Sequence, residues 1–68
     1  MDLREKLKIL MDNKMLSLTE IEKKNSKLKK FALYYFINGG NTTQYKELQT
    51  AVNEIIKQKL KILNDLAE

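Results

Sequence analysis

The chain lacks the residue types on which much of protein chemistry depends. Its 68 residues contain no cysteine, histidine, proline or tryptophan. The absence of cysteine and histidine excludes disulfides and the usual zinc sites, and it removes the commonest thiol nucleophile and the commonest general base. Gly39 and Gly40, the only glycines, have the spacing of neither a P-loop nor a dinucleotide-binding loop. We therefore expect a protein that is not an enzyme and that uses no cofactor and no metal.

Long apolar runs are also missing. The longest, residues 31–37, is far shorter than the roughly 20 residues that a membrane-spanning helix needs. The N-terminal residues alternate charged and apolar side chains and contain no apolar core of a signal peptide. The sequence therefore predicts a cytoplasmic protein that makes no contact with a membrane.

The length predicts one small domain over residues 1–68. A chain of this size buries only about 60% of the surface that its unfolded state exposes, so a single core is marginally stable. Because disulfides and zinc are excluded, self-association is the remaining common source of extra stability. We therefore expect a homodimer.

Three helical segments follow from the spacing of apolar residues, which indicates an all-α fold. The first, over about residues 2–13, carries four apolar side chains on one face with Ile9 on the other: Leu3, Leu7, Leu10 and Met11. Residues 12–14 are polar and end the pattern. The sequence predicts a short N-terminal helix.

The second predicted helix spans about residues 17–38. Ser17 and Glu20 have the spacing of a capping box, in which each side chain bonds the backbone amide of the other. Gly39 and Gly40 are suited to end the helix, and Lys24 and Asn25 interrupt its apolar face at a point where it could bend. In this interpretation Phe31, Ala32, Tyr35 and Phe36 face the third helix, whereas Leu33, Tyr34 and Ile37 point elsewhere.

The third predicted helix spans about residues 42–66 and carries two apolar rows. The first row keeps a 3-4 spacing through Tyr45, Leu48, Val52, Ile55, Ile62 and Leu66, and the second contains Ile56, Leu60, Leu63 and Ala67. A face this wide should contact more than one neighbour. We expect a helical hairpin of the two long helices, and two such hairpins would form a dimeric helical bundle.

Lys59 interrupts the first apolar row of the third helix. One interpretation is a lysine whose aliphatic stem covers apolar surface while its ammonium group stays in water. The other is a polar position that selects the oligomeric state, in which case Lys59→Leu would raise thermal stability and loosen the choice of oligomer.

The net charge of +4 is concentrated in the middle of the chain. Residues 23–46 hold six lysines and no acidic residue, whereas the segments on either side each sum to −1. Lys23, Lys27 and Lys30 follow the i, i+4, i+7 spacing of one helix face, and Tyr34 continues this line. The predicted partner-binding residues combine these side chains with two apolar neighbours: Lys23, Lys27, Lys30, Leu33, Tyr34 and Ile37.

Three functions are compatible with this basic face. The favoured one is a regulator, inhibitor or assembly factor that binds an acidic or apolar surface of another protein, a role that small basic helical proteins often have in bacteria and phages. The alternative is a nucleic-acid-binding protein that holds phosphates through its lysines and stacks a base on Tyr34. A third interpretation assigns the lysines to solubility alone.

One short stretch resembles a known family. Residues 31–44, FALYYFINGGNTTQ, resemble the opening of the DNA-binding domains of phage small terminases, where an aromatic helix ends at a glycine-asparagine-alanine-threonine-glutamine turn. In that family a helix of small residues and a glycine-tyrosine pair follow, whereas this chain continues with YKELQTAV. The resemblance covers residues 31–44 only, and we assign no family from it.

Overall fold

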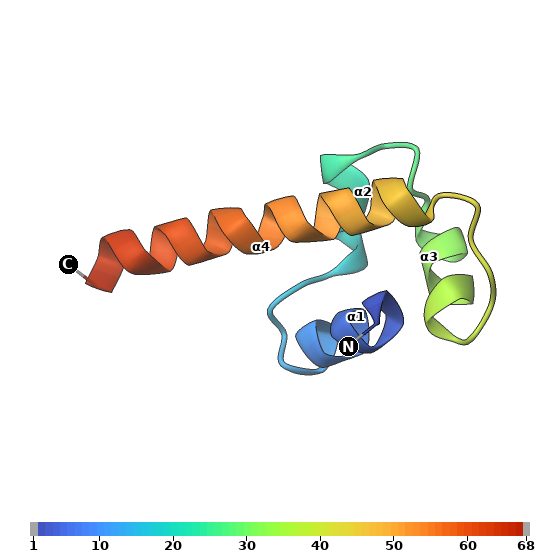
Figure 1. The fold of residues 1–68 in the computed structure, drawn as a ribbon, viewed down its shortest axis with the longest axis horizontal. Coiled ribbons are helices and arrows are strands. Elements are labelled where there is room, and N and C mark those ends of the chain that lie inside the picture. Colours follow the sequence, from blue (N-terminus) through green and yellow to red (C-terminus); the bar gives the residue numbers. More distant parts are fainter. Residues whose placement is uncertain (1, 68) are drawn as a thin grey trace.

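The computed structural model describes residues 2–67, and within this range the fold is all-α (Figure 1). Its four helices are α1 (Leu3–Asp12), α2 (Leu18–Lys24), α3 (Lys30–Ile37) and α4 (Tyr45–Ala67). α2 packs against α4, and α3 packs against both α1 and α2. The predicted all-α class is confirmed, and the molecule is elongated, measuring 41 × 22 × 18 Å along its principal axes.

The hydrophobic core receives side chains from all four helices. α1 contributes Leu3 and Leu7, α2 contributes Leu18 and Ile21, and the segments between helices add Leu16 and Leu28. The remaining core residues come from α3 and from the N-terminal half of α4: Leu33, Phe36, Ile37, Leu48, Ala51, Val52 and Ile55. Because α1, α2 and α3 all pack near the N-terminal half of α4, the core lies at one end of the long helix.

α1 has the position and the buried face that its spacing predicts. Its N-cap is Asp2, whose carboxylate accepts a hydrogen bond of 2.8 Å from the Glu5 amide. At its other end the Lys14 and Met15 amides donate to the carbonyls of Met11 and Leu10, which is the pairing of a Schellman motif. Lys14 has the positive φ, 57°, that this motif requires.

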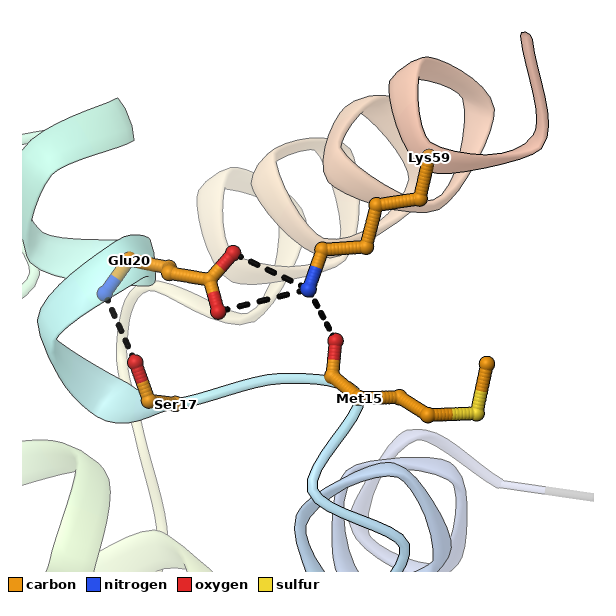
Figure 2. A network of polar contacts seen from close by, with 4 residues as sticks. All are labelled: Met15, Ser17, Glu20 and Lys59. Carbon is orange, nitrogen blue, oxygen red and sulfur yellow. Dashed lines mark hydrogen bonds and ion pairs between the residues drawn. The ribbon is translucent and has the colours of Figure 1, made fainter. Parts of the chain in front are cut away.

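α2 begins at the predicted cap, but only half of the predicted capping box forms. The Ser17 hydroxyl accepts a hydrogen bond of 3.3 Å from the Glu20 amide. The Glu20 carboxylate lies beside Lys59 of α4 instead, with a closest distance of 3.1 Å to its ammonium nitrogen. Figure 2 shows that the same ammonium group also donates to the Met15 carbonyl. The side chain expected to close the cap therefore links α2 to α4.

The prediction of a single long helix over residues 17–38 is wrong, because two short helices occupy this range. α2 ends at Lys24, and α3 begins only at Lys30. Asn25 has an extended backbone, with φ −145° and ψ 105°, and its side chain accepts a hydrogen bond from the Lys27 amide. An asparagine that bonds to the backbone two residues later stabilises a turn and competes with the helix. The hairpin of two long helices is therefore not seen among residues 2–67.

The long helix predicted over residues 42–66 forms as α4, which begins three residues later than predicted and runs from Tyr45 to Ala67 without a break. Its N-terminal half is covered by the other helices. Its C-terminal half, residues 56–67, extends away from them (Figure 1), and we call this part of α4 the arm. Four large apolar side chains of the arm are at least half exposed: Leu60, Ile62, Leu63 and Leu66.

Candidate functional site

The turn between α2 and α3 holds the basic middle of the chain in a defined conformation. Leu28 is buried in the core and anchors the turn, and its amide donates to the Asn25 carbonyl. The Glu22 carboxylate of α2 accepts a hydrogen bond of 3.2 Å from the Lys30 amide and so caps the start of α3. Gln44, just before α4, donates from its side chain to the Lys27 carbonyl. Contacts from both sides therefore fix the turn and the start of α3.

Three aromatic side chains on α3 project into solvent. Phe31 is 79% exposed, Tyr34 57% and Tyr35 64%. Their spacing of three and four residues places them on one side of the helix. We call these three residues the aromatic face. An eight-residue helix that leaves three aromatic rings in water is unusual, because such rings contribute strongly to cores and interfaces when they are buried.

Exposed lysines surround the start of this helix. Lys27 and Lys29 lie in the turn, and Lys30 is the first residue of α3. Lys23, in the last turn of α2, lies beside Gln58 and Ile62 of α4 instead. Among the lysines of residues 23–46, Lys24 forms an ion pair within the described part of the chain. Its ammonium nitrogen lies 3.5 Å from the Glu54 carboxylate. The region around the start of α3 therefore combines several positive charges with the aromatic face.

The predicted stripe of Lys23, Lys27 and Lys30 along one helix does not form. Lys23 belongs to α2, Lys27 to the turn and Lys30 to α3, so the three side chains are neighbours in the chain without sharing a helix face. The i, i+4, i+7 rule applies only within a continuous helix. The structure keeps all three lysines exposed but arranges them around a turn.

Two of the predicted partner-binding residues are core residues. Leu33 and Ile37 are buried together with Phe36, whereas Phe31 and Tyr35, which were expected to face inward, are exposed. The interpretation assumed one helical phase from residue 17 onward. The non-helical residues 25–29 change that phase, and α3 consequently turns a different side to the core. Of the apolar and aromatic residues predicted for the partner, only Tyr34 remains on the surface.

Arg4 of α1 fastens the end of α3, a role that the sequence interpretation missed. Its Nε donates to the Phe36 carbonyl at 2.7 Å and its Nη2 donates to the Gly40 carbonyl at 2.6 Å. The guanidinium also lies over the Phe36 ring, 4.6 Å from the centroid. Arg4 is the only arginine in the chain. The planar guanidinium group can donate to two carbonyls and stack on an aromatic ring at the same time, whereas the ammonium group of lysine cannot.

The two glycines shape the end of α3 for different reasons. Gly39 has a φ of +105°, which an L-residue with a side chain rarely adopts, and its amide donates to the Phe36 carbonyl. Gly40 lies under the ring of Tyr35, so closely that an added Cβ would overlap the ring atoms. The second glycine therefore allows Tyr35 to lie against the backbone and fixes one part of the aromatic face.

Within residues 2–67, no group of three or more histidine, cysteine, aspartate or glutamate side chains has a metal-binding arrangement. In the same range, none of the helices combines the length and the hydropathy needed to cross a bilayer.

Together, the fold and this surface define a class: a small all-helical protein that presents an aromatic face beside a group of lysines. No protein-family model, curated protein or solved structure matches the chain.

Proposed function

We propose that this chain is a non-enzymatic, cytoplasmic, nucleic-acid-binding protein that holds single-stranded regions on α3. The observation that carries the proposal is the exposure of Phe31, Tyr34 and Tyr35 on a helix whose start is surrounded by lysines. Lysines hold phosphates by displacing counterions, without regard to sequence. Aromatic rings stack on unpaired bases, and each stacked base contributes about 1–3 kcal/mol.

The contacts of Arg4 support binding with little sequence preference. Reading of guanine in a duplex depends largely on arginine, which donates two hydrogen bonds to the base edge. The one arginine of this chain donates to the Phe36 and Gly40 carbonyls. The Glu22 carboxylate at the start of α3 accepts a hydrogen bond from the Lys30 amide. The other exposed groups near α3 are ammonium ions and aromatic rings, and these recognise phosphates and base faces rather than base edges.

The burial of Leu33 and Ile37 weakens the function that the sequence favoured. A protein-binding surface on α3 was expected to combine Tyr34 with these two aliphatic side chains. Both belong to the core, and Phe31, Tyr34 and Tyr35 are the large side chains that α3 exposes. Three rings next to lysines are better suited to bases and phosphates than to an apolar protein groove.

The proposal is tested by titrating labelled single-stranded DNA, duplex DNA and structured RNA with the protein at about 50 and about 200 mM salt. We expect micromolar binding that is tightest for single strands. The affinity should fall tenfold or more between the two salt concentrations if several phosphates are held, since the salt dependence scales with about 0.7 of the number of phosphates for single strands. Absence of binding at 50 mM salt would contradict the proposal.

Variants separate the stacking contribution from the charge. Phe31→Ala and Tyr34→Ala should each weaken binding about tenfold, because each removes a stacking platform, and should leave the salt dependence unchanged. Lys27→Ala together with Lys30→Ala should weaken binding and also reduce the salt dependence. Lys57→Ala together with Lys61→Ala is the matched control, since it removes two exposed lysines from the arm instead. Equal losses in the two lysine pairs would contradict a site at α3.

A protein partner is the second candidate, and the exposure of Tyr34 and Phe31 supports it. Large aromatic side chains that lie near basic ones are common anchors of protein interfaces. In this case the chain would bind none of the nucleic-acid probes. A partner with an acidic surface would bind the wild-type chain and would lose most of its affinity for Phe31→Ala and Tyr34→Ala.

A further inference from the structure

The arm of α4 exposes an apolar face that nothing else in residues 2–67 covers. Leu60, Ile62, Leu63 and Leu66 are between 53% and 77% exposed. A helical segment of about a dozen residues is marginally stable in water unless an amphipathic face is packed. The arm continues a helix whose first half is packed, and its uncovered apolar face would gain stability from a neighbour.

An apolar groove continues this face toward the other helices. α4 lines one side of it, from Ile55 to Leu63 and including Lys59, and the end of α1 together with the segment after it lines the other. The lining residues are Ile55, Ile56, Lys59, Leu60, Leu63, Leu10, Met15 and Leu16. Leu60 and Leu63 belong to the groove as well as to the exposed face. The face and the groove therefore form one continuous apolar surface.

The charged group that lines the groove is already paired. Lys59 forms an ion pair with Glu20 at 3.1 Å and donates a hydrogen bond to the Met15 carbonyl (Figure 2). At 100° per residue, Lys57, Lys61 and Asp65 lie on the opposite side of the arm. Lys23 lies beside Ile62 on one edge of the face, whereas the paired Lys59 is the charged residue that lines the groove at Leu60 and Leu63. The groove side of this surface therefore suits an apolar partner, and it is unsuited to nucleic acid or an acidic protein.

The spacing of the arm matches a second copy of itself. Ile56, Leu60, Leu63 and Ala67 are separated by four, three and four residues, which is the spacing of a coiled-coil seam. This pattern is the same in both chain directions. When two arms pair antiparallel about a two-fold axis, Leu60 of one copy meets Leu63 of the other, and Ile56 meets the small Ala67.

We propose that the arm is the interface of an antiparallel homodimer, in which the arm of each copy covers the apolar face and groove of the other. A large aliphatic side chain that is half exposed leaves roughly 100 Å² of apolar surface in water. Four such side chains from each copy, Leu60, Leu63, Leu66 and Met15, would remove about 800 Å² in total, which is the size of a weak, reversible interface. The contact is isologous, so it closes at two copies.

Sedimentation equilibrium of the full chain without nucleic acid, over a range of about 1–300 μM, tests the interface. We expect twice the chain mass at the upper end of this range. Leu63→Lys, which places a charge in the centre of the seam, should weaken association at least tenfold. Asp65→Lys places a lysine on the opposite side of the same arm and should associate like the wild type. A wild-type chain that is monomeric throughout, or a Leu63→Lys chain that associates normally, would overturn the proposal.

Disulfide trapping tests the direction of pairing, because the chain contains no cysteine of its own. In an antiparallel pair the two Ile56 positions lie about 16 Å apart along the axis at 1.5 Å per residue, beyond the reach of a disulfide. Ile56→Cys alone and Ala67→Cys alone should therefore form no dimeric disulfide, whereas an equal mixture should form the mixed one rapidly. Efficient cross-linking within either variant alone would overturn the antiparallel arrangement.

The two proposals can fail separately. The dimer is measured without nucleic acid and depends on residues of the arm. The titration depends on residues of α3, and a monomer with intact α3 would still bind single strands.

Discussion

The two halves of α4 have similar apolar spacing but different surroundings. In the N-terminal half, Leu48, Val52 and Ile55 are buried by the helices that precede α4. In the arm, Leu60, Leu63 and Leu66 continue a similar pattern and remain exposed. Periodicity identifies which side of a helix is apolar. It does not say how much of that side the other helices of the chain cover. In this protein the other helices cover only half of α4.

This difference divides the molecule into a body that contains the core and an arm whose apolar face the proposed dimer would cover. Fully burying a leucine contributes about 1.5–3 kcal/mol, and small domains have only about 5 kcal/mol or somewhat more in total. A few substitutions in the body should therefore unfold the protein. Equivalent substitutions in the arm should affect only its oligomeric state.

The largest expected effect comes from the same substitution made in each half. Leu48 is 1% exposed and Leu63 is 53% exposed. Leu48→Ala should lower the free energy of unfolding by about 3 kcal/mol, because it removes buried methyl groups and leaves a cavity. Urea unfolding should show this loss at every protein concentration. Leu63→Ala should lower stability only at concentrations where the wild type is dimeric, and equal losses in the two variants at low concentration would abolish the distinction.

A medium effect is expected at the polar contact that holds α1 to α3. Arg4→Met keeps an aliphatic stem but removes both hydrogen bonds and the cation–π contact with Phe36. We expect a loss of about 1–2 kcal/mol, since hydrogen bonds to charged groups contribute more than neutral ones. Thermal or urea unfolding measures the loss, which should be independent of protein concentration because the contact lies in the body. Arg4→Lys should recover only a small part of it.

The smallest effect is expected at Lys59, where the arm leaves the body. Lys59→Met keeps the stem and removes the pair with Glu20, whose side chain is 41% exposed while that of Lys59 is 36% exposed. A pair this accessible to water contributes about 0.5 kcal/mol. One of the two interpretations of Lys59 in the sequence expected a gain in stability from Lys59→Leu, but the observed pairing reverses the expected sign. A double-mutant cycle with Glu20→Gln isolates the interaction, and a more stable Lys59→Met variant would restore the original expectation.

The site was less predictable than the helices because it depends on the phase of one short helix. The sequence placed Leu33, Tyr34 and Ile37 on the surface by extending the phase of α2 through Asn25. The bend that was considered at Lys24 and Asn25 is a complete interruption, fixed by the Asn25 side chain, by the buried Leu28 and by the Glu22 carboxylate. The burial of Leu28 joins the interruption to the rest of the core, and the Glu22 contact bridges it from α2 to α3. Local propensity does not contain such information.

Sequence patterns alone predict the all-α class, Ser17 as the N-cap of α2, the approximate extents of α1 and α4, and the position of the basic stretch. These features follow from spacing, capping and composition, which act between residues close in the chain. Three features are known only from the tertiary structure. Leu33 and Ile37 of α3 are buried in the core, and Arg4 donates hydrogen bonds to carbonyls at the end of this helix. The arm of α4 is not covered by the other helices. Each of these features depends on contacts between segments that are distant in the sequence. Such contacts result from the packing of the whole chain, which local sequence patterns do not describe.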